Sequence, residues 1–306
     1  MIPTERNWSR GLLLSFVTAA LWGGMPLVLK GLVDYLDPLT ATSYRYFLCL
    51  LGNVAYVLIL RNSSWKHLRN RRVLALVAIC IAGMLINNIL FLYGLRLTGP
   101  GASQVISQLG PVMLLLGSVL IFREAFSSRQ WLGAALVVTG LVLFFHNRLT
   151  ALHDLDGYGT GMLILMIAPV FWAAYGLAQK KMTGLLGPQQ VLVMIYGAGT
   201  LLLLPIASLP AIAAMNINGH LFALGGMVVT VVSYGTFNGA LAQWEASRVS
   251  AILTLTPLFT LLITRVAAFA RPDLFVYEHN DALSWLGAGV VVLGSLCVAV
   301  PRYRRR

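Results

Sequence analysis

The sequence predicts an all-α integral membrane protein with ten transmembrane helices in two inverted five-helix repeats, and three observations lead to this fold class. Apolar residues make up 58% of the chain and charged residues 10%, against about 25% charged residues in an average soluble domain. Roughly ten apolar segments of membrane-spanning length follow one another. The decapeptide WLGAALVVTG at 131–140 also returns as WLGAGVVVLG at 285–294, with seven of ten residues identical.

The apolar segments are interpreted as helices. About 20 apolar residues cross the hydrocarbon layer, a helix satisfies its own backbone polar groups in lipid, and no segment alternates as a barrel strand would. The connections are short, so no appended soluble domain is expected. The predicted spans are 11–30, 39–60, 73–95, 101–122, 130–146, 158–179, 189–209, 220–242, 249–269 and 283–300.

Matching residues in the two halves indicate an internal repeat. The offset drifts between 145 and 154 residues, which small loop insertions explain. Each half then holds five spans, over 11–146 and 158–300, and an odd number of spans inserts the second half upside down relative to the first. Inverted repeats are typical of transporters whose substrate site lies near the midplane between the halves. Besides the decapeptides, the matched pairs are Trp22 and Trp172, Lys30 and Lys180, Pro38 and Pro188, Gly94 and Gly239, and Pro111 and Pro257.

Basic residues gather on one side of the predicted membrane. With a cytoplasmic N-terminus, only Lys30, Arg96, Arg148 and Arg271 fall outside, and the positive-inside rule then places both termini in the cytoplasm. We expect a multi-pass protein of the bacterial inner membrane. The net charge of +12 has the same origin, so no nucleic-acid partner is expected. The basic residues on the inner side are Arg6, Arg10, Arg61, Lys66, Arg69, Arg71, Arg72, Arg123, Arg129, Lys180, Lys181, Arg248, Arg302, Arg304, Arg305 and Arg306.

Several motifs resemble those of the EamA-type drug/metabolite transporters. They are the Trp-Gly pair at 22–23, the Lys that ends the first span, Pro38, YRYF at 44–47, and LGPVMLLLGSVLIFREAFSSRQWLGAALVVTG at 109–140. The resemblance covers nearly the whole chain. It implies ten helices in two inverted repeats that move small metabolites, often outward, through a central cavity. The chain departs from the pattern at Ile195, the counterpart of Arg45, and in the connection between spans 9 and 10, which lacks the Glu.

Functional residues are expected among polar groups that lipid would reject. Gln104 and Gln108 lie one helical turn apart in the fourth span, and Asn87 and Asn88 interrupt the third. The alternative is that polar groups bridge helices, each worth about 0.6 kcal/mol, which suits Ser and Thr because they can bond their own backbone. The paired amides instead predict a wet cavity. The predicted substrate-binding residues are Trp22, Asn87, Asn88, Tyr93, Gln104, Gln108, Trp172, Tyr175, Tyr234, Asn238 and Thr254.

Aromatic and small residues have structural interpretations as well. Trp22, Trp172, Tyr93 and Tyr175 either line the cavity or serve as packing and interfacial anchors. The glycines of the duplicated decapeptides predict close helix packing, so the fifth and tenth spans are expected to lie outside the cavity as scaffold.

Embedded charge bears on the energy source. All ten acidic residues and five histidines fall in loops or at span ends. Proton and sodium relays usually use an intramembrane carboxylate or His, so the sequence favours facilitated diffusion or exchange. Lys30, Arg45 and Arg265 lie in the outer half of the predicted membrane. They either snorkel toward the surface or form a cationic mouth that attracts a carboxylate-bearing solute.

The predicted function is transport of small metabolites, amino-acid-like or other small organic solutes, by an exporter or exchanger that alternates access around a central cavity. The alternatives are a non-transporting receptor or assembly protein and a membrane-embedded enzyme. The chain lacks the motifs G-x-x-x-x-G-K-[ST], His-Glu-x-x-His and G-x-S-x-G. The three cysteines lack metal-ligand spacing, and no cofactor or metal is expected. Expected partners are a small-molecule solute and the lipid bilayer, for a monomer or homodimer.

The charge asymmetry predicts a topology that labelling can test. Single cysteines introduced in 61–72 should react only from the cytoplasmic side, and cysteines in 150–157 only from outside. The opposite result for either loop would contradict the inverted repeat.

Overall fold

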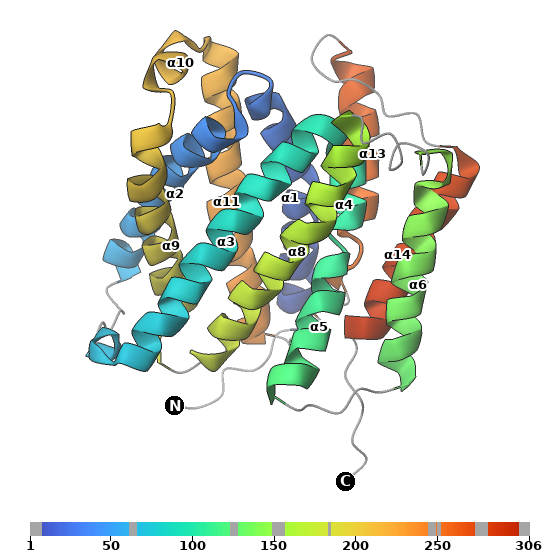
Figure 1. The fold of residues 1–306 in the computed structure, drawn as a ribbon, viewed down its shortest axis with the longest axis horizontal. Coiled ribbons are helices and arrows are strands. Elements are labelled where there is room, and N and C mark those ends of the chain that lie inside the picture. Colours follow the sequence, from blue (N-terminus) through green and yellow to red (C-terminus); the bar gives the residue numbers. More distant parts are fainter. Residues whose placement is uncertain are drawn as a thin grey trace.

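The computed structural model describes residues 8–60, 66–122, 128–148, 157–182, 185–243, 249, 252–272 and 281–299. Every regular element in these ranges is a helix, and the protein is a helical membrane protein (Figure 1). Five described helices are long and apolar enough to cross a membrane, and three shorter helices are apolar as well.

The helices follow one another with short connections. Those of the first half are α1 (Trp8–Val33), α2 (Pro38–Leu60), α3 (Arg71–Thr98), α4 (Pro100–Ile106), α5 (Leu109–Phe122) and α6 (Ser128–Phe144), with the 3-10 turns η1 (Lys66–Arg69) and η2 (His146–Arg148). Those of the second half are α8 (Gly157–Lys181), α9 (Pro188–Leu203), α10 (Leu209–Ala214), α11 (Ile217–Gln243), α13 (Thr256–Ala270) and α14 (Ala282–Ala299), with η3 (Leu204–Ile206).

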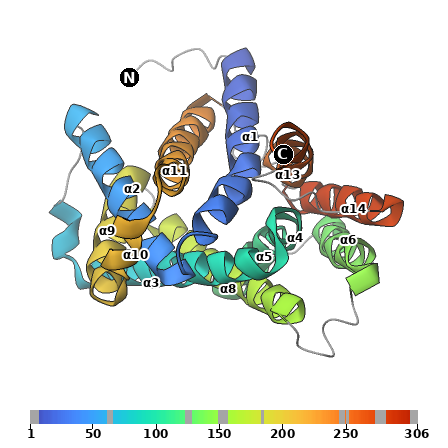
Figure 2. The ribbon, with the colours of Figure 1, turned by 90° about the horizontal axis from the view of Figure 1, so that it is seen from above.

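Helices of the first half pack mainly against helices of the second. The strongest contacts join α3 to α8, α6 to α14, α1 to α11 and α2 to α9. From above, α1 and α11 lie opposite α3 and α8, while the α2–α9 and α6–α14 pairs occupy the two ends (Figure 2). When each helix is replaced by its counterpart in the other half, the α3–α8 contact becomes the α11–α1 contact. The α6–α14 and α2–α9 pairs map onto themselves.

The α6–α14 pair contains the duplicated decapeptides, and their contacts are reciprocal. A Cβ added at Gly140 would lie 2.6 Å from Val291 N and 2.8 Å from Gly287 O. A Cβ added at Gly294 would lie 2.6 Å from Val137 N and 2.7 Å from Gly133 O. The first contact becomes the second when each residue is replaced by its counterpart in the other half. The glycines therefore let the two backbones touch, which is how helices associate in lipid without a hydrophobic drive.

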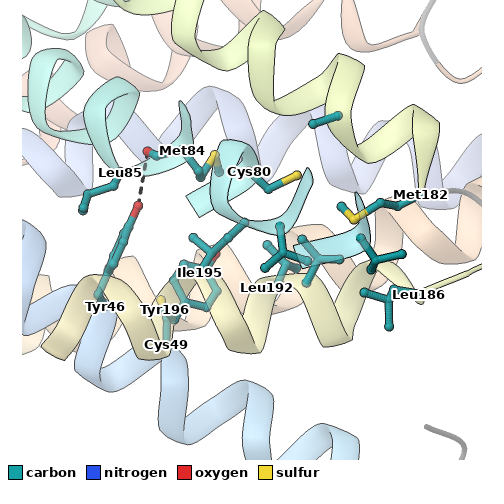
Figure 3. Close-up of a cluster of buried hydrophobic side chains, with 14 of the residues drawn as sticks. Tyr46, Cys49, Cys80, Met84, Leu85, Met182, Leu186, Leu192, Ile195 and Tyr196 are labelled. Carbon is teal, nitrogen blue, oxygen red and sulfur yellow. Dashed lines mark hydrogen bonds between the residues drawn. The ribbon is translucent and has the colours of Figure 1, made fainter. Parts of the chain in front are cut away.

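An apolar cluster closes the opposite end of the molecule, where α2 and α9 meet α3 and α8 (Figure 3). Tyr46 is fully buried there, and its hydroxyl donates to Met84 O at 3.3 Å. Its ring meets that of Tyr196, its counterpart 150 residues later, edge to face with centroids 5.1 Å apart. These contacts fix the rotation of α2 about its axis.

The fourth and ninth predicted spans are not continuous helices, which corrects the sequence prediction. Span 101–122 breaks between α4 and α5 at the turn of Ser107 and Gln108, and span 249–269 breaks at the turn of Thr254 and Leu255. Pro111 and Pro257 follow these turns, and a proline cannot donate to the carbonyl four residues earlier. Hydrogen bonds from residue i to residue i−3 occur at the breaks in place of the α-helical bonds to residue i−4. They include Gln108 N to Val105 O at 3.2 Å and Leu255 N to Ile252 O at 3.0 Å. Pro26 and Pro169, in contrast, lie inside α1 and α8.

The glycine contact predicts opposite effects for two substitutions on α14. Gly287→Ala should lower the thermal unfolding temperature in detergent, because the new Cβ would lie 2.4 Å from Phe144 N and overpacking costs about 1–3 kcal/mol. Gly289→Ala is the matched control. No described atom lies within 4 Å of its Cβ position, and Ala favours a helix over Gly by about 1 kcal/mol. Equal unfolding temperatures for both variants would show that the backbone contact is not required.

Candidate functional site

A cavity of about 570 Å³ lies between the two halves. Residues of α1, α2, α3, α4 and α5 line it together with residues of α8, α9, α11 and α13, and none of the lining residues belongs to α6 or α14. Both helix breaks border the cavity, since Ser107, Gln108 and Thr254 are among its lining residues. The polar residues at the two helix breaks therefore face the cavity. The close glycine contacts of α6 and α14 lie outside it.

Nine of the eleven predicted substrate-binding residues line this cavity. Tyr93 does not, because its side chain is 37% exposed on the outer face of α3. The Asn238 side chain lies outside the described residues, although its backbone belongs to α11. The residues that the structure brings together are Trp22, Asn87, Asn88, Gln104, Gln108, Trp172, Tyr175, Tyr234 and Thr254.

Three side-chain amides in the lining have no partner in the described part of the chain. Asn87, Gln104 and Gln108 make no side-chain hydrogen bond there, and Gln108 is only 7% exposed. The bridging role considered from the sequence therefore does not apply to these three amides. Asn87 and Gln104 are partly exposed, and none of the three has a fully buried amide atom without a partner, so all three amides are open to water or a bound solute.

Aromatic rings form much of the remaining wall. Trp22 Nε1 donates to Ser233 Oγ at 2.9 Å, and the Trp22 ring lies 5.8 Å from the ring of Tyr234 and 5.4 Å from that of Phe237. Trp172 lies against Gly110 at the start of α5, where an added Cβ would be 3.1 Å from Trp172 Cε3. Both tryptophans thus line the cavity, as one of the two interpretations predicted.

For Arg45 the sequence left two interpretations open, snorkelling or a cationic mouth, and the structure excludes the first. Its side chain does not snorkel, because the residue is only 3% exposed and lines the cavity. Its Nη2 donates to Asn88 Oδ1, while its Nε is buried without a hydrogen-bond partner. Lys30, in contrast, is paired with Asp34 at 3.0 Å, and Arg265 is exposed.

Other lining residues were missed although the repeat carried a signal for them. Phe91 and Phe237 line the cavity and stand 146 residues apart, as do Met84 and Thr230. The offset is the one that relates Pro111 to Pro257. Each of these residues is thus the repeat counterpart of another lining residue, but none is the counterpart of a predicted site residue, so a search that starts from polar groups overlooks them.

The lining is mainly apolar with a few polar groups. No Asp, Glu, His or Lys is among the described residues that line the cavity, and its hydroxyl groups include those of Tyr175, Tyr196 and Tyr234. The volume falls within the roughly 300–1,000 Å³ of small-molecule sites, and a mainly apolar wall with a few polar groups is typical of them.

The family model described as EamA-like transporter family matches residues 9–146 and 159–300. The chain is 36% identical over 293 residues to a protein of Escherichia coli (strain K12) named "Uncharacterized inner membrane transporter YhbE", with 95% of this chain and 91% of that protein covered. It is 29% identical over 290 residues to an uncharacterized transporter of Haemophilus influenzae, covering 95% and 94% of the two chains.

A solved structure described only as the crystal structure of a protein has a similar fold. The TM-score is 0.65 at 15% sequence identity, with 95% of this chain and 96% of the other covered. At this identity the likeness concerns the fold alone.

The unpaired amides give a prediction for Gln108. Gln108→Leu should leave the unfolding temperature of the ligand-free protein unchanged or higher, because it removes an unpaired polar group without leaving a void, and should weaken solute binding about tenfold, as expected for a lost hydrogen bond. Thermal-shift titration with a bound solute measures both effects. Tyr93→Phe on the outer face of α3 is the control and should bind normally. Normal binding by Gln108→Leu, or weak binding by Tyr93→Phe, would contradict the assignment of the cavity.

Proposed function

The chain belongs to the EamA-like transporter family, and on this premise we propose that it moves small organic solutes across the inner membrane through the cavity between its halves. The observation that carries the proposal is the cavity itself, which both halves line and in which three amides have no partner among the described residues. Such a site can carry solute across the membrane without forming an open pore if the protein opens it to one side at a time.

The proposed architecture is that of ten spans in two inverted repeats, over 11–146 and 158–300, with both termini in the cytoplasm. Support comes from the pairing of helices, which is unchanged when the halves are exchanged, and from the reciprocal glycine contacts of α6 and α14. The broken spans add further support, because discontinuous helices at the midplane are typical of transporter sites.

The proposed mechanism is alternating access, in which one half rocks against the other around the cavity. The two helix breaks lie at equivalent places in the halves and next to the cavity. Residues at element ends absorb the backbone changes of such motions, so the turns at Gln108 and Thr254 are the proposed hinges. The same motion serves an exporter or an exchanger, since the solute gradient sets the direction of net flux.

The proposed energy source is the solute gradient rather than a proton relay in the cavity. Ion-coupled relays usually contain an embedded acid or His, and the described lining contains neither. The single charged side chain among the described lining residues is that of Arg45, which is neither an acid nor a His.

Flux into proteoliposomes tests this function. Purified protein should exchange at least one labelled compound from a panel of amino acids, organic acids, nucleosides and cationic drugs, identified first by its stabilisation of the protein. Exchange should persist when a proton ionophore is added at a fixed solute gradient. Loss of exchange with the ionophore would refute the uncoupled mechanism. Absence of flux for every stabilising compound would favour a receptor over a transporter.

A further inference from the structure

Arg45 is the only charged residue among the described residues that line the cavity. It is 3% exposed, and no carboxylate in the described part of the chain pairs with it. A buried ion without a counter-charge is strongly unfavourable. The ligand-free cavity therefore holds a positive charge that an anionic group entering it would balance.

The surroundings hold the guanidinium in place. Tyr46, the next residue, is locked by its hydrogen bond to Met84 O, and the Arg45 guanidinium carbon lies 5.8 Å from the centre of the Tyr46 ring. The aliphatic part of the side chain passes Gly226 on α11, where an added Cβ would be 3.7 Å from Arg45 Cδ. Asn88 Oδ1 accepts from Nη2, and Asn88 is itself oriented by its donation to Met84 O at 2.8 Å.

The free donors match a planar anion. With Nη2 engaged, the Nε of Arg45 remains without a partner, and a guanidinium can present two parallel N–H donors to a carboxylate. The amides of Asn87, Gln104 and Gln108 can donate as well, since no residue in the described part of the chain pairs with them. At the break between α4 and α5 the opposite ends of two helix dipoles meet, so this break adds little net charge and Arg45 sets the sign of the cavity.

The rest of the wall suits an uncharged body. It contains the rings of Trp22, Trp172, Phe91 and Phe237, and no described lining residue carries a negative charge that would pair with an ammonium group.

From these contacts we propose that the cavity selects small organic monoanions, whose carboxylate pairs with Arg45 while an apolar or aromatic body lies against the tryptophans. Neutral and cationic solutes of the same shape are discriminated against, and so are zwitterions. The proposal rests on the transport function proposed above and names the substrate class for the same cavity.

The test uses full-length protein and a matched set of probes: phenylacetate, phenylacetamide, phenethylamine and phenylalanine, with isovalerate and isovaleramide as a smaller pair. Thermal-shift titrations in a buffer without chloride measure binding, and counterflow in proteoliposomes measures transport. The carboxylates should stabilise wild-type protein more than their amides, the amine or the amino acid. Arg45→Gln should weaken carboxylate binding about 10- to 100-fold, as expected for a lost hydrogen bond to a charged group, and should leave amide binding unchanged.

Two further variants separate binding from folding. Arg96→Gln removes an exposed arginine at the end of α3 and should bind the carboxylates as wild type does. Arg45→Lys keeps the charge without the planar donor pair, so it should retain the preference for anions with weaker binding, and it replaces Arg45→Gln if that protein does not fold. A merely structural Arg45 would instead give a lower unfolding temperature in the ligand-free variants and no change in the ratio of carboxylate to amide binding.

Several outcomes would overturn the proposal. They are equal stabilisation by phenylacetate and phenylacetamide, tighter binding of phenylalanine than of phenylacetate, or saturation of the Arg45-dependent effect by chloride alone, which would make the site an inorganic anion site. A counterflow rate that depends neither on probe charge nor on the Arg45 substitution would refute the anion selectivity and leave the transport function standing. Carboxylate binding that depends on Arg45 without any flux would refute the transport function alone.

Discussion

Close backbone contact between the two halves is the constraint on which the rest of the structure depends. The bilayer offers no hydrophobic gain for joining two apolar helices, so association requires helices to approach closely over surfaces without side chains. Glycines provide such surfaces at several interfaces between the halves. An added Cβ would lie 2.7 Å from Phe171 O at Gly83 and 3.1 Å from Thr256 O at Gly23.

The cavity follows from what those contacts exclude. Gln104, Gln108 and Asn87 lie where the helices leave a cavity, and none of these amides has a partner among the described residues. The prolines after the two breaks reinforce this arrangement, because they remove helical hydrogen bonds at the level of the cavity. The candidate binding groups thus lie where the two halves leave a cavity rather than where their helices touch.

The sequence predicted the helical class and much of the site, because both follow from what lipid rejects. A charged or amide side chain in an apolar run is unfavourable in contact with lipid, so it is expected to face the protein interior. Nine of the eleven predicted residues line the cavity. The sequence did not predict which face of a helix is buried. Tyr93 lies five positions after Asn88 on α3 and therefore points outward rather than into the cavity. The burial of Arg45 was left open for another reason. Snorkelling and burial are both consistent with a charge near a span end, and only the packing of Tyr46 decides between them.

Two-fold construction has a consequence for the charge of the cavity. A chain made of two equal copies would place every residue twice, and a second arginine at the equivalent position would be a second buried charge, which is costly without a counter-charge. Here the counterpart of Arg45 is Ile195, which is fully buried in the apolar cluster between α2 and α9. A site for one charge therefore has to break the symmetry of the scaffold that holds it. Because position 45 is Arg and its counterpart 195 is Ile, the two repeats cannot replace each other in the site.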